Sequence, residues 1–566
     1  MSDVLARALA ELHAGRAAHA EALLRAWPQT AGSAAALQML GAALSAQGRD
    51  EAALAAFESA AALQPPTPAL LHNRAQALFR LGRHADAMRG YREALHLDPG
   101  LAPARARLAE VLEAAGRESY QAKRHGEALA SFAEALALDP TRDGARNAMG
   151  GALAALGRFD EALECFRAVS SRSPANADAI NNLGYVLQER GELAAAMRQF
   201  ERALEIQPDH AGALTNLGVA RQEEGRAEEA AALYRRALAA DPDAAGAGYN
   251  LAILQLGALQ FAEGWEGNEL RYRTVPPIAT ERAFDIPRFG PDDWGRGHRI
   301  ALWGEQGIGD RIVYSTLLPE LESRGERFVL ETDARLVAAY RRAHPQWTVV
   351  TREESQAAFA SCSRQLALAS LPRLMRRSLE SFDRQPASVL AADPARAAEF
   401  RARLAAPGRR LVGISWRSFQ KSARGALQRR KSAPLAAFLA LSRRPNLRLV
   451  DLQYGDSAAE RAAFASLGGE LARLEDLDLF HDIDGVLAAV DACDVVLTTS
   501  NVTAHLAGAL GKRTLLVYLA ARPPFHYWAT HASGAGLWYP SMRIVTGPRI
   551  DTWEEALQRA GELLGA

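Results

Sequence analysis

Hydroxyl, amide and imidazole side chains gather in one stretch of the C-terminal half, residues 497–513. The stretch follows a short apolar run and contains Asn501, Thr503 and His505, before an Ala/Leu segment that Gly511 is placed to end. This pattern predicts a strand, a turn and a helix. The free N–H groups at such a helix start, together with the helix dipole, favour an anion such as phosphate.

A glycine-rich turn, residues 304–311, contains Gly307, Gly309 and Asp310. Glycines let the backbone approach a ligand at the carboxyl end of a strand. The turn lacks the Gly-Lys-Ser/Thr ending of a Walker loop and does not match the dinucleotide fingerprint. Asp310, at the start of a predicted helix, is either a general base that accepts a proton from a hydroxyl or a helix N-cap, and the sequence leaves both open.

Eight basic residues and no acidic one lie between Arg409 and Lys431. In a chain of zero formal net charge, such a local excess favours an anionic partner. We therefore predict a phosphate clamp, with Arg417 and Lys431 as contacts because they border the segment. A solvated basic loop is the alternative.

Two Asp-x-Asp pairs, Asp476 with Asp478 and Asp482 with Asp484, have a spacing that can hold a divalent cation. They stand in a polar run before the helix predicted at Val486 to Ala492. We therefore expect a solvated loop, and the sequence predicts no metal site.

The elements that must position these residues alternate between strand and helix, which predicts parallel sheets in two Rossmann-like lobes facing a cleft. The predicted helices are Ile312 to Ser323 and Ala334 to Ala343. The predicted strands are Arg299 to Trp303, Arg327 to Leu330, Trp347 to Val350, Arg410 to Trp416, Leu447 to Gln453, Asp494 to Leu497 and Thr514 to Leu519.

The first half of the sequence repeats itself. The set Leu183-Gly184, Ala196, Phe200, Ala203 and Pro208 recurs 34 residues later. Small residues at fixed positions allow two helices to approach closely, an aromatic ring fills the gap, and proline ends the second helix. This period and pattern resemble the tetratricopeptide repeat, which implies a superhelix of helical hairpins.

One interval breaks the period. The pairs Asp98-Pro99 and Asp139-Pro140 are 41 residues apart, seven more than the repeat. Seven residues make about two helical turns. We therefore predict one lengthened helix near Leu101 to Ala122.

Four asparagines, Asn73, Asn182, Asn216 and Asn250, fall at equivalent positions on the first helix of their repeats. A ladder of side-chain amides can hydrogen-bond the backbone of an extended peptide without reading its sequence. We predict a groove for a protein acceptor; the alternative is that asparagine is merely tolerated on a polar helix surface.

Length and composition limit the number of domains, the kind of partner and the location of the protein. A chain of 566 residues is too long for one core, so two or three domains are expected. Zero net charge argues against a general nucleic-acid or membrane-surface binder. The three cysteines are far apart, no apolar run reaches the roughly 20 residues of a membrane span, and the first residues do not read as a signal peptide, which predicts a cytoplasmic location.

The second half resembles a glycosyltransferase domain that follows tetratricopeptide repeats in many bacterial proteins, related to the heptosyltransferase type of the GT-B fold. The architecture is also similar to O-GlcNAc transferases and bacterial flagellin glycosyltransferases. The matching pieces are residues 261–265, 305–310, 370–372, 413–416, 452–455, 504–511 and 538–540.

The resemblance implies that Asp310 is the base, that Asn501, Thr503 and His505 surround the donor phosphate, and that Gln453 and Tyr454 lie near the nucleotide. A buried histidine near a helix start is the alternative for His505. The chain departs from these relatives by having Ser500 where an acidic residue is usual and Arg311 where a small or acidic one is commoner.

The predicted organisation is an α superhelix at 1–250, a capping helix and linker at 251–291, an N-terminal GT-B lobe at 292–405 and a C-terminal, nucleotide-sugar-binding lobe at 406–566. The predicted function is metal-independent, cofactor-free O-glycosylation of a protein acceptor from a nucleotide sugar. Flagellin and a CMP-nonulosonic acid are the acceptor and donor that the architecture implies. An inactive repeat scaffold and a transferase for glycan or lipid-linked acceptors are the alternatives, and the oligomeric state stays open.

Overall fold

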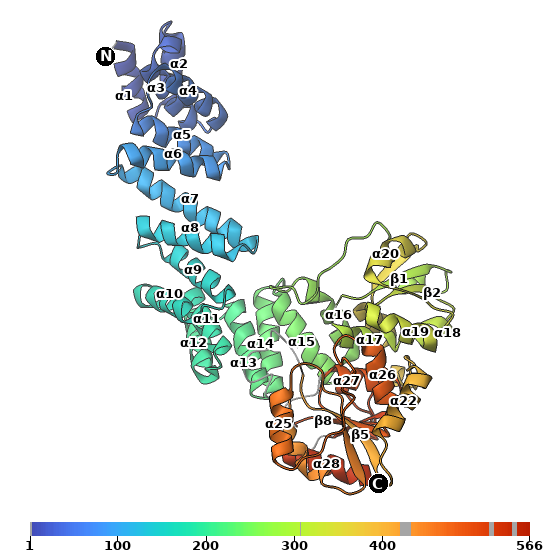
Figure 1. The fold of residues 1–566 in the computed structure, drawn as a ribbon. Coiled ribbons are helices and arrows are strands. Elements are labelled where there is room, and N and C mark those ends of the chain that lie inside the picture. Colours follow the sequence, from blue (N-terminus) through green and yellow to red (C-terminus); the bar gives the residue numbers. More distant parts are fainter. Residues whose placement is uncertain (1–2, 306, 419–431, 520–525, 546–551, 566) are drawn as a thin grey trace. The chain divides into compact units, whose positions relative to one another are not determined.

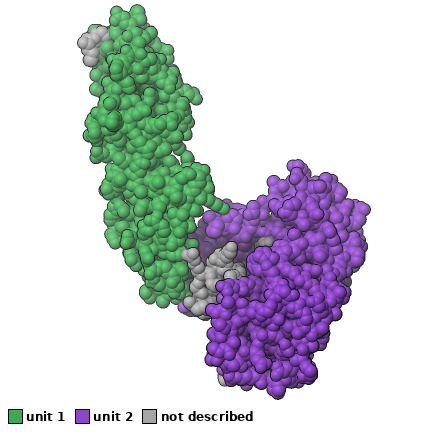
Figure 2. Space-filling view, viewed as in Figure 1, with its two compact units in different colours: residues 1–206 green, residues 207–566 purple. Residues whose placement is uncertain are grey.

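The computed structural model describes residues 3–305, 307–418, 432–519, 526–545 and 552–565 (Figure 1). The chain divides into two compact units, residues 1–206 and 207–566, which Figure 2 colours separately. No helix within the described residues is both long and apolar enough to cross a membrane.

The first unit consists of helices that pack in sequence as hairpins. They are α1 (Asp3–His13), α2 (Ala17–Ala26), α3 (Ala34–Ala46), α4 (Asp50–Leu63), α5 (Pro68–Arg80), α6 (His84–Leu97), α7 (Ala102–Gln121), α8 (His125–Leu138), α9 (Asp143–Ala155), α10 (Phe159–Arg172), α11 (Ala177–Glu189) and α12 (Leu193–Ile206).

Close approach of the two helices in a hairpin depends on glycine. A Cβ added at Gly150 would lie 2.7 Å from the ring of Phe166, and one at Gly184 would lie 2.6 Å from Phe200. Gly41 and Gly116 have the same relation to aromatic rings of their partner helices. The predicted pairing of a small residue with an aromatic ring is confirmed.

The lengthened helix is also confirmed. Helix α7 has 20 residues, whereas α3, α5, α9 and α11 have 13 each. Gly116 in α7 and Gly150 in α9 stand equally far from the last residues of their helices. The additional two turns therefore lie at the N-terminal end of α7, before the contact with the ring of Phe132.

The second unit begins with further hairpins, α13 (Ala211–Glu223), α14 (Ala227–Ala240), α15 (Ala245–Gly257) and α16 (Phe261–Asn268). A short 3-10 helix, η2 (Glu269–Tyr272), follows α16 and packs against α15. The chain then reaches the edge of the first sheet, where the N–H of Phe289 donates to the carbonyl of Gln365.

The first sheet is parallel, with strand order β3-β2-β1-β4. Its strands are β1 (Arg299–Trp303), β2 (Arg327–Glu331), β3 (Thr348–Val350) and β4 (Arg364–Ala367). The first three lie close to the predicted bounds, whereas β4 was not predicted. The helical segments that accompany it are α17 (Ile308–Ser315), α18 (Leu318–Ser323), η4 (Ala334–Leu336), α19 (Val337–Ala343), α20 (Arg352–Phe359), η5 (Leu368–Ser370) and α21 (Leu371–Met375).

The helix predicted at Ile312 to Ser323 is wrong in its bounds. It starts four residues earlier, with Gly307 as its N-cap, and it divides into α17 and α18. Pro319 stands in the first turn of α18, where proline's missing N–H leaves no hydrogen bond unmade. As a result Asp310 lies inside the first turn of α17 and is not its N-cap.

The second sheet is also parallel, with strand order β6-β5-β7-β8-β9. Its strands are β5 (Arg410–Ser415), β6 (Leu447–Asp451), β7 (Val495–Thr498), β8 (Thr514–Val517) and β9 (Met542–Val545). The helical segments around it are α22 (Pro394–Leu404), η7 (Leu435–Phe438), α24 (Leu439–Ser442), α25 (Ala458–Ser466), α26 (Ile483–Ala492), α27 (Val502–Ala509), η8 (His526–Trp528) and α28 (Trp553–Gly565).

Gly511 ends α27 as predicted, with a φ of +72° that side-chain-bearing residues rarely adopt. One apolar core runs from the first sheet to α26 and α27 and includes Trp265, Ile312, Val486 and Leu506. This core packs α17 against α27, and Figure 1 shows the two helices side by side between the sheets.

Candidate active site

The starts of helices α17 and α27 meet in the second unit. Each helix follows the carboxyl end of a parallel strand, β1 and β7 respectively. A Cβ added to Gly309 would lie 2.9 Å from Cδ2 of His505, so backbone and imidazole are in direct contact. The two stretches that the sequence singled out are thus brought together, where open α/β sheets bind their ligands.

The start of α27 is capped by its own side chain. Asn501 Oδ1 accepts hydrogen bonds from the N–H of Ala504 and the hydroxyl of Thr498, both at 3.2 Å. Asn501 Nδ2 donates to Ser415 Oγ at 2.9 Å. Within the described residues, the N–H groups of Val502 and Thr503 have no acceptor. These two amides are the groups available to an anion.

His505 is buried and neutral. Its Nδ1 lies 3.0 Å from the hydroxyl oxygen of Tyr539, and its ring packs against Tyr527 and Trp528 with centroid distances of 5.2 and 4.6 Å. Burial, reinforced by His526, lowers the pKa of His505 to about 3. At neutral pH the imidazole carries no charge and can supply one N–H donor.

Asp310 lies among phenols. Burial raises the pKa values of Tyr249, Tyr314, Tyr527 and Tyr539, and the Asp310 carboxylate raises each of them further. Tyr249 belongs to α15, the others to α17, η8 and the segment after it. These four phenols therefore remain protonated at neutral pH and lie within electrostatic reach of the carboxylate.

A cavity of about 180 Å³ opens between the two helix starts. Its walls are mainly apolar, with Arg335, Tyr454 and Thr503 as polar residues. The cavity is lined by Ile308, Arg335, Tyr454, Leu479, Phe480, Ile483, Val486, Val502, Thr503 and Leu506. Arg335 donates to the carbonyl of Phe480 at 2.9 Å, and the Phe480 ring is 50% exposed.

Several of the predicted donor-binding side chains are engaged with the protein itself. Gln453 Oε1 accepts from the N–H groups of Trp416 and Arg417 at 2.9 and 2.7 Å, and its Nε2 donates to the Tyr454 carbonyl at 2.8 Å. Arg417 forms an ion pair with Glu460 at 3.3 Å. Gln453 therefore joins the ends of β5 and β6, and its predicted role near the nucleotide stays a prediction.

The other two predicted donor contacts are Thr503 and Lys431. Thr503 is the second residue of α27, and its Oγ1 donates to the Leu452 carbonyl at 3.4 Å. Lys431 lies outside the described residues, together with most of the basic segment that precedes it.

The aspartates near α26 only partly fit the predicted solvated loop. Asp482 is the N-cap of α26 and forms an ion pair with Arg396 of α22. Asp484, inside α26, pairs with Arg342 of α19 at 3.0 Å. These two partly exposed carboxylates join α26 to α22 and α19 through arginines. No group of His, Cys, Asp or Glu within the described residues is arranged to hold a metal ion.

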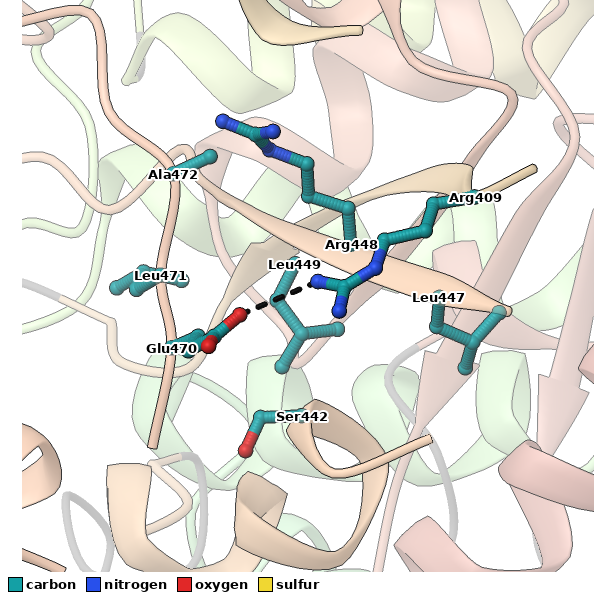
Figure 3. Close-up of a pocket in the computed structure, with 8 residues that line it drawn as sticks. All are labelled: Arg409, Ser442, Leu447, Arg448, Leu449, Glu470, Leu471 and Ala472. Atoms are coloured by element: carbon teal, nitrogen blue, oxygen red, sulfur yellow. Dashed lines mark hydrogen bonds and ion pairs between the residues drawn. The ribbon is translucent and has the colours of Figure 1, made fainter. Parts of the chain in front are cut away.

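A second hollow, of about 390 Å³, lies at the opposite edge of the second sheet. It is bordered by Leu447, where β6 begins, and by Arg409, which precedes β5. Figure 3 shows the ion pair between Arg409 and Glu470, at 3.1 Å, across this hollow. Because parallel strands place their amino ends together, the hollow is remote from the two helix starts.

In the first unit, the predicted asparagine ladder has a partner that the spacing did not reveal. Asn182 Nδ2 donates to Asn147 Oδ1 at 3.3 Å, which joins α11 to α9. Asn147 stands one residue away from the equivalent register, so a strict period misses it. Asn73 is half-buried on α5; Asn216 and Asn250 are half-buried on α13 and α15 of the second unit.

Two exposed tyrosines accompany the ladder in the first unit. Tyr120 of α7 and Tyr185 of α11 are 40% and 44% exposed. A Cβ added at Gly151 of α9 would lie 3.7 Å from the Tyr120 hydroxyl, and Tyr120 contributes to the raised pKa of Tyr185 after burial and Glu189. The sequence analysis missed this aromatic surface because exposed tyrosines carry no periodic signal.

Family models support the repeat assignment. The model described as tetratricopeptide repeat matches residues 34–67, 68–101, 147–211, 181–245 and 215–259. The chain carries tetratricopeptide repeats. The array thus includes hairpins of both units, up to α15.

Several solved repeat proteins resemble part of the chain. YrrB, a TPR protein with an unusual peptide-binding site, is 24% identical, with a TM-score of 0.28 and coverage of 34% of this chain and 95% of that one. MamA is 22% identical, with a TM-score of 0.26 and coverage of 30% and 94%. The C-terminal part of a TPR protein from Cytophaga hutchinsonii is 14% identical, with a TM-score of 0.33 and coverage of 42% and 95%.

Among curated proteins, FlbA of Caulobacter vibrioides is 31% identical over 334 residues. The match covers 55% of this chain and 53% of FlbA, so the chain spans about half the length of that relative. Fifty-five per cent of this chain exceeds the stretch that ends at residue 259, and the similarity therefore extends beyond the repeats into the α/β region.

Proposed function

We propose that the chain is a protein O-glycosyltransferase whose α/β region is a GT-B module. In this proposal the module transfers a sugar from a nucleotide-activated donor to a protein that the repeats hold. The observation that carries the proposal is the meeting of two helix starts at one cavity, which Ile308 of α17 and Val502 and Thr503 of α27 line. Helix α17 carries the Asp310 carboxylate in its first turn, and α27 has unpaired amides there.

The reaction needs one proton acceptor and one anion site. The acceptor hydroxyl oxygen bonds to the anomeric carbon while the bond from that carbon to the donor phosphate breaks, and Asp310 takes the hydroxyl proton. The nucleotide leaves with the bonding electron pair on its phosphate oxygen. The amides of Val502 and Thr503, already fixed by the helix, stabilise that negative charge.

The residues that line the cavity match the chemistry of a nucleotide donor. An apolar wall of Val486 and Leu506 beside the aromatic rings of Tyr454 and Phe480 suits a flat nucleobase. The cavity ends at Val502 and Thr503, so a nucleoside placed there directs its phosphate to the start of α27. The neutral imidazole of His505 can supply one N–H hydrogen-bond donor near this helix start and adds no charge there.

The acceptor is assigned to the repeats because side-chain amides can hydrogen-bond an extended peptide. The Asn147 and Asn182 pair, with Tyr120 and Tyr185 nearby, offers both amide and aromatic contacts on neighbouring helices. Flagellin as acceptor and a CMP-nonulosonic acid as donor are carried over from the architectural resemblance alone.

A nucleotide panel followed by a transfer assay tests the proposal. CMP, UDP, GDP and ADP are compared by thermal shift, because a ligand that binds only the native state raises the melting temperature. The sugar nucleotide of the stabilising base is then incubated with flagellin and with unrelated proteins, and intact mass is measured. No stabilisation by any nucleotide, and no mass increase, would overturn the proposal.

A repeat scaffold without transfer activity is the second candidate function. It is favoured by the engagement of Gln453 and Asn501, whose polar side-chain atoms hydrogen-bond the protein itself. Retained binding of a flagellin-type partner without sugar transfer from any donor would favour the scaffold.

A further inference from the structure

Arg271 in η2 is fully buried, and every N–H group of its guanidinium has an acceptor. Within its own segment it donates to the Asn268 carbonyl at 3.0 Å, to Glu269 Oε1 at 2.9 Å and to the Tyr272 hydroxyl at 2.7 Å. A buried arginine satisfied in this way is held in a single position.

Its other two hydrogen bonds reach the first sheet. Nε donates to Glu305 Oε1 at 2.7 Å, and the second terminal nitrogen donates to Ser370 Oγ at 2.8 Å. Glu305 follows β1 and Ser370 follows β4, and these strands are neighbours, with Trp303 paired to Ala367. Arg271 therefore lies over the carboxyl ends of two adjacent strands.

The network is balanced in charge. Arg288 also contacts Glu269 and donates to Ser370 at 2.8 Å, so two arginines face two carboxylates. Burial acts to raise the pKa of Glu269, but the charges of Arg271 and Arg288 outweigh it and the pKa is lowered. The Glu269 carboxylate is thus held as an anion that needs its arginine partners.

Glu305 is fixed from both sides. One carboxylate oxygen accepts from Arg271 and the other from the Tyr272 hydroxyl. Glu305 lies two residues before Gly307, the N-cap of the helix that carries Asp310 in its first turn. The hold on Glu305 therefore acts next to the start of α17, where the glycine has no side chain of its own to fix the entry of the chain.

The segment that holds Glu305 is packed on the last helices of the repeat array. Helix η2 follows α16 and packs against α15. The same charged groups affect Tyr249 of α15. Burial and, after it, the Asp310 carboxylate raise the pKa of Tyr249 to about 12; Arg271 acts to lower this pKa and Glu305 acts to raise it. Repeat array and turn therefore share one neighbourhood.

We propose that Arg271 is a positioning residue that clamps Glu305 and thereby fixes Asp310 opposite the start of α27. The clamp joins the last hairpin of the repeats to the turn that carries the base. The inference rests on the proposed function, because it gives Asp310 the role of proton acceptor.

The first test compares Arg271→Lys with Arg273→Lys in the full chain. Lysine keeps the charge but has three N–H donors and no planar fork, so it cannot replace the five hydrogen bonds that Arg271 donates. Arg273 is the matched control, since it is exposed and contacts only Asp243 among the described acidic groups. The readouts are kcat, KM for the sugar nucleotide, and the nucleotide-induced shift in melting temperature.

For Arg271→Lys we expect kcat about 100-fold lower, as for a reacting group displaced by about 1 Å, with KM and the nucleotide shift unchanged. Arg273→Lys should match wild type. Wild-type kcat in a folded Arg271→Lys protein would overturn the clamp. A wild-type protein that transfers no sugar would overturn the proposed function and the clamp with it.

A second pair of variants separates positioning from folding. Tyr272→Phe removes only the hydroxyl that bonds Glu305, and it should lower kcat about 10-fold at an unchanged melting temperature. Arg271→Met with Glu305→Gln removes both opposite charges, and it should be no slower than Arg271→Met alone, because the two act as one unit. Independent, multiplying losses of kcat would contradict the clamp.

Discussion

The starts of α17 and α27 lie against each other but are built differently. Helix α17 has Gly307 as its N-cap, without a side chain, and carries a charged group, Asp310, in its first turn. Helix α27 is capped by Asn501, has no acidic residue in its first turn, and holds the neutral His505. The start of α17 carries a negative charge, whereas the start of α27 has free amide N–H groups that can bind one.

In the proposed transfer, this difference gives two similar turns opposite parts in one reaction. A helix dipole favours an anion at either start. At α17 the anion is a side chain of the protein, whereas the first turn of α27 contains no acidic residue and in the proposal receives the donor phosphate. The contact between Gly309 and His505 keeps the two parts at one cavity.

Replacing Asp310 with Asn should produce the largest effect, because it removes the charge that distinguishes α17. We expect transfer to fall by about 10²–10⁴, the range for loss of a general base, with nucleotide-induced stabilisation retained. Turnover measured at several pH values checks this. Asp285→Asn, at an exposed position in the linker, is the control, and full activity of Asp310→Asn would remove the acid–base contrast between the two helices.

Gly309→Ala tests the contact itself. The added Cβ would lie 2.9 Å from His505, whose ring is confined by Trp528 and Tyr539, so the two helix starts must separate. We expect a loss of about 1–3 kcal/mol in the free energy of unfolding, and weaker nucleotide binding.

Gly307→Ala is the matched substitution, because an added Cβ there meets only Asp310 Oδ2, at 3.6 Å. It should leave stability near that of wild type. Equal effects of the two alanines, measured by denaturant unfolding and nucleotide titration, would show that the contact does not hold the helices together.

The neutrality of the α27 start predicts an acid dependence of stability. The pKa values of His505 and His526 are about 3 in the folded chain, because both are buried. Below about pH 6.5 the unfolded chain binds protons that the folded chain does not. The free energy of unfolding should therefore fall with pH between about 6.5 and 3, by up to about 1.4 kcal/mol per pH unit for each histidine.

His526→Gln should reduce that slope in unfolding experiments at pH 7, 5.5 and 4.5. His481→Gln is the control, because His481 is largely exposed beside Asp478. A nucleotide affinity that rose steeply as pH fell through 6.5 would mean that His505 becomes cationic, and the contrast with α17 would then be one of opposite charges.

Changes in the repeats should leave both helix starts unaffected. Tyr120→Ala with Tyr185→Ala should raise KM for the protein acceptor about 10-fold, equivalent to about 1.4 kcal/mol, without changing KM for the sugar nucleotide. Asn182→Ala should have a smaller effect in the same direction. A changed nucleotide KM would show that the repeats influence the donor site directly.

Local patterns were sufficient to predict the repeats and seven of the described strands, but they missed β4 and β9. The lengthened α7 followed from one interval between Asp-Pro pairs, and the contact of Gly184 with Phe200 followed from the helix period. The strand at Arg299 to Trp303 matches β1, since buried parallel strands are continuous apolar runs. The start of α17 was misplaced, because Ile308-Gly309-Asp310 carries no helix-start residue ahead of it.

The sequence by itself determined that Asp310 and the stretch around Asn501 follow strand ends and begin helices, because capping, glycine and apolar runs act over a few residues. Only the tertiary structure decided what surrounds them. The neutral state of His505 depends on rings more than twenty residues away in the chain, and the clamp of Arg271 on Glu305 joins residues 34 positions apart. Burial and ion pairing arise from packing between elements, and no local spacing records which elements will meet.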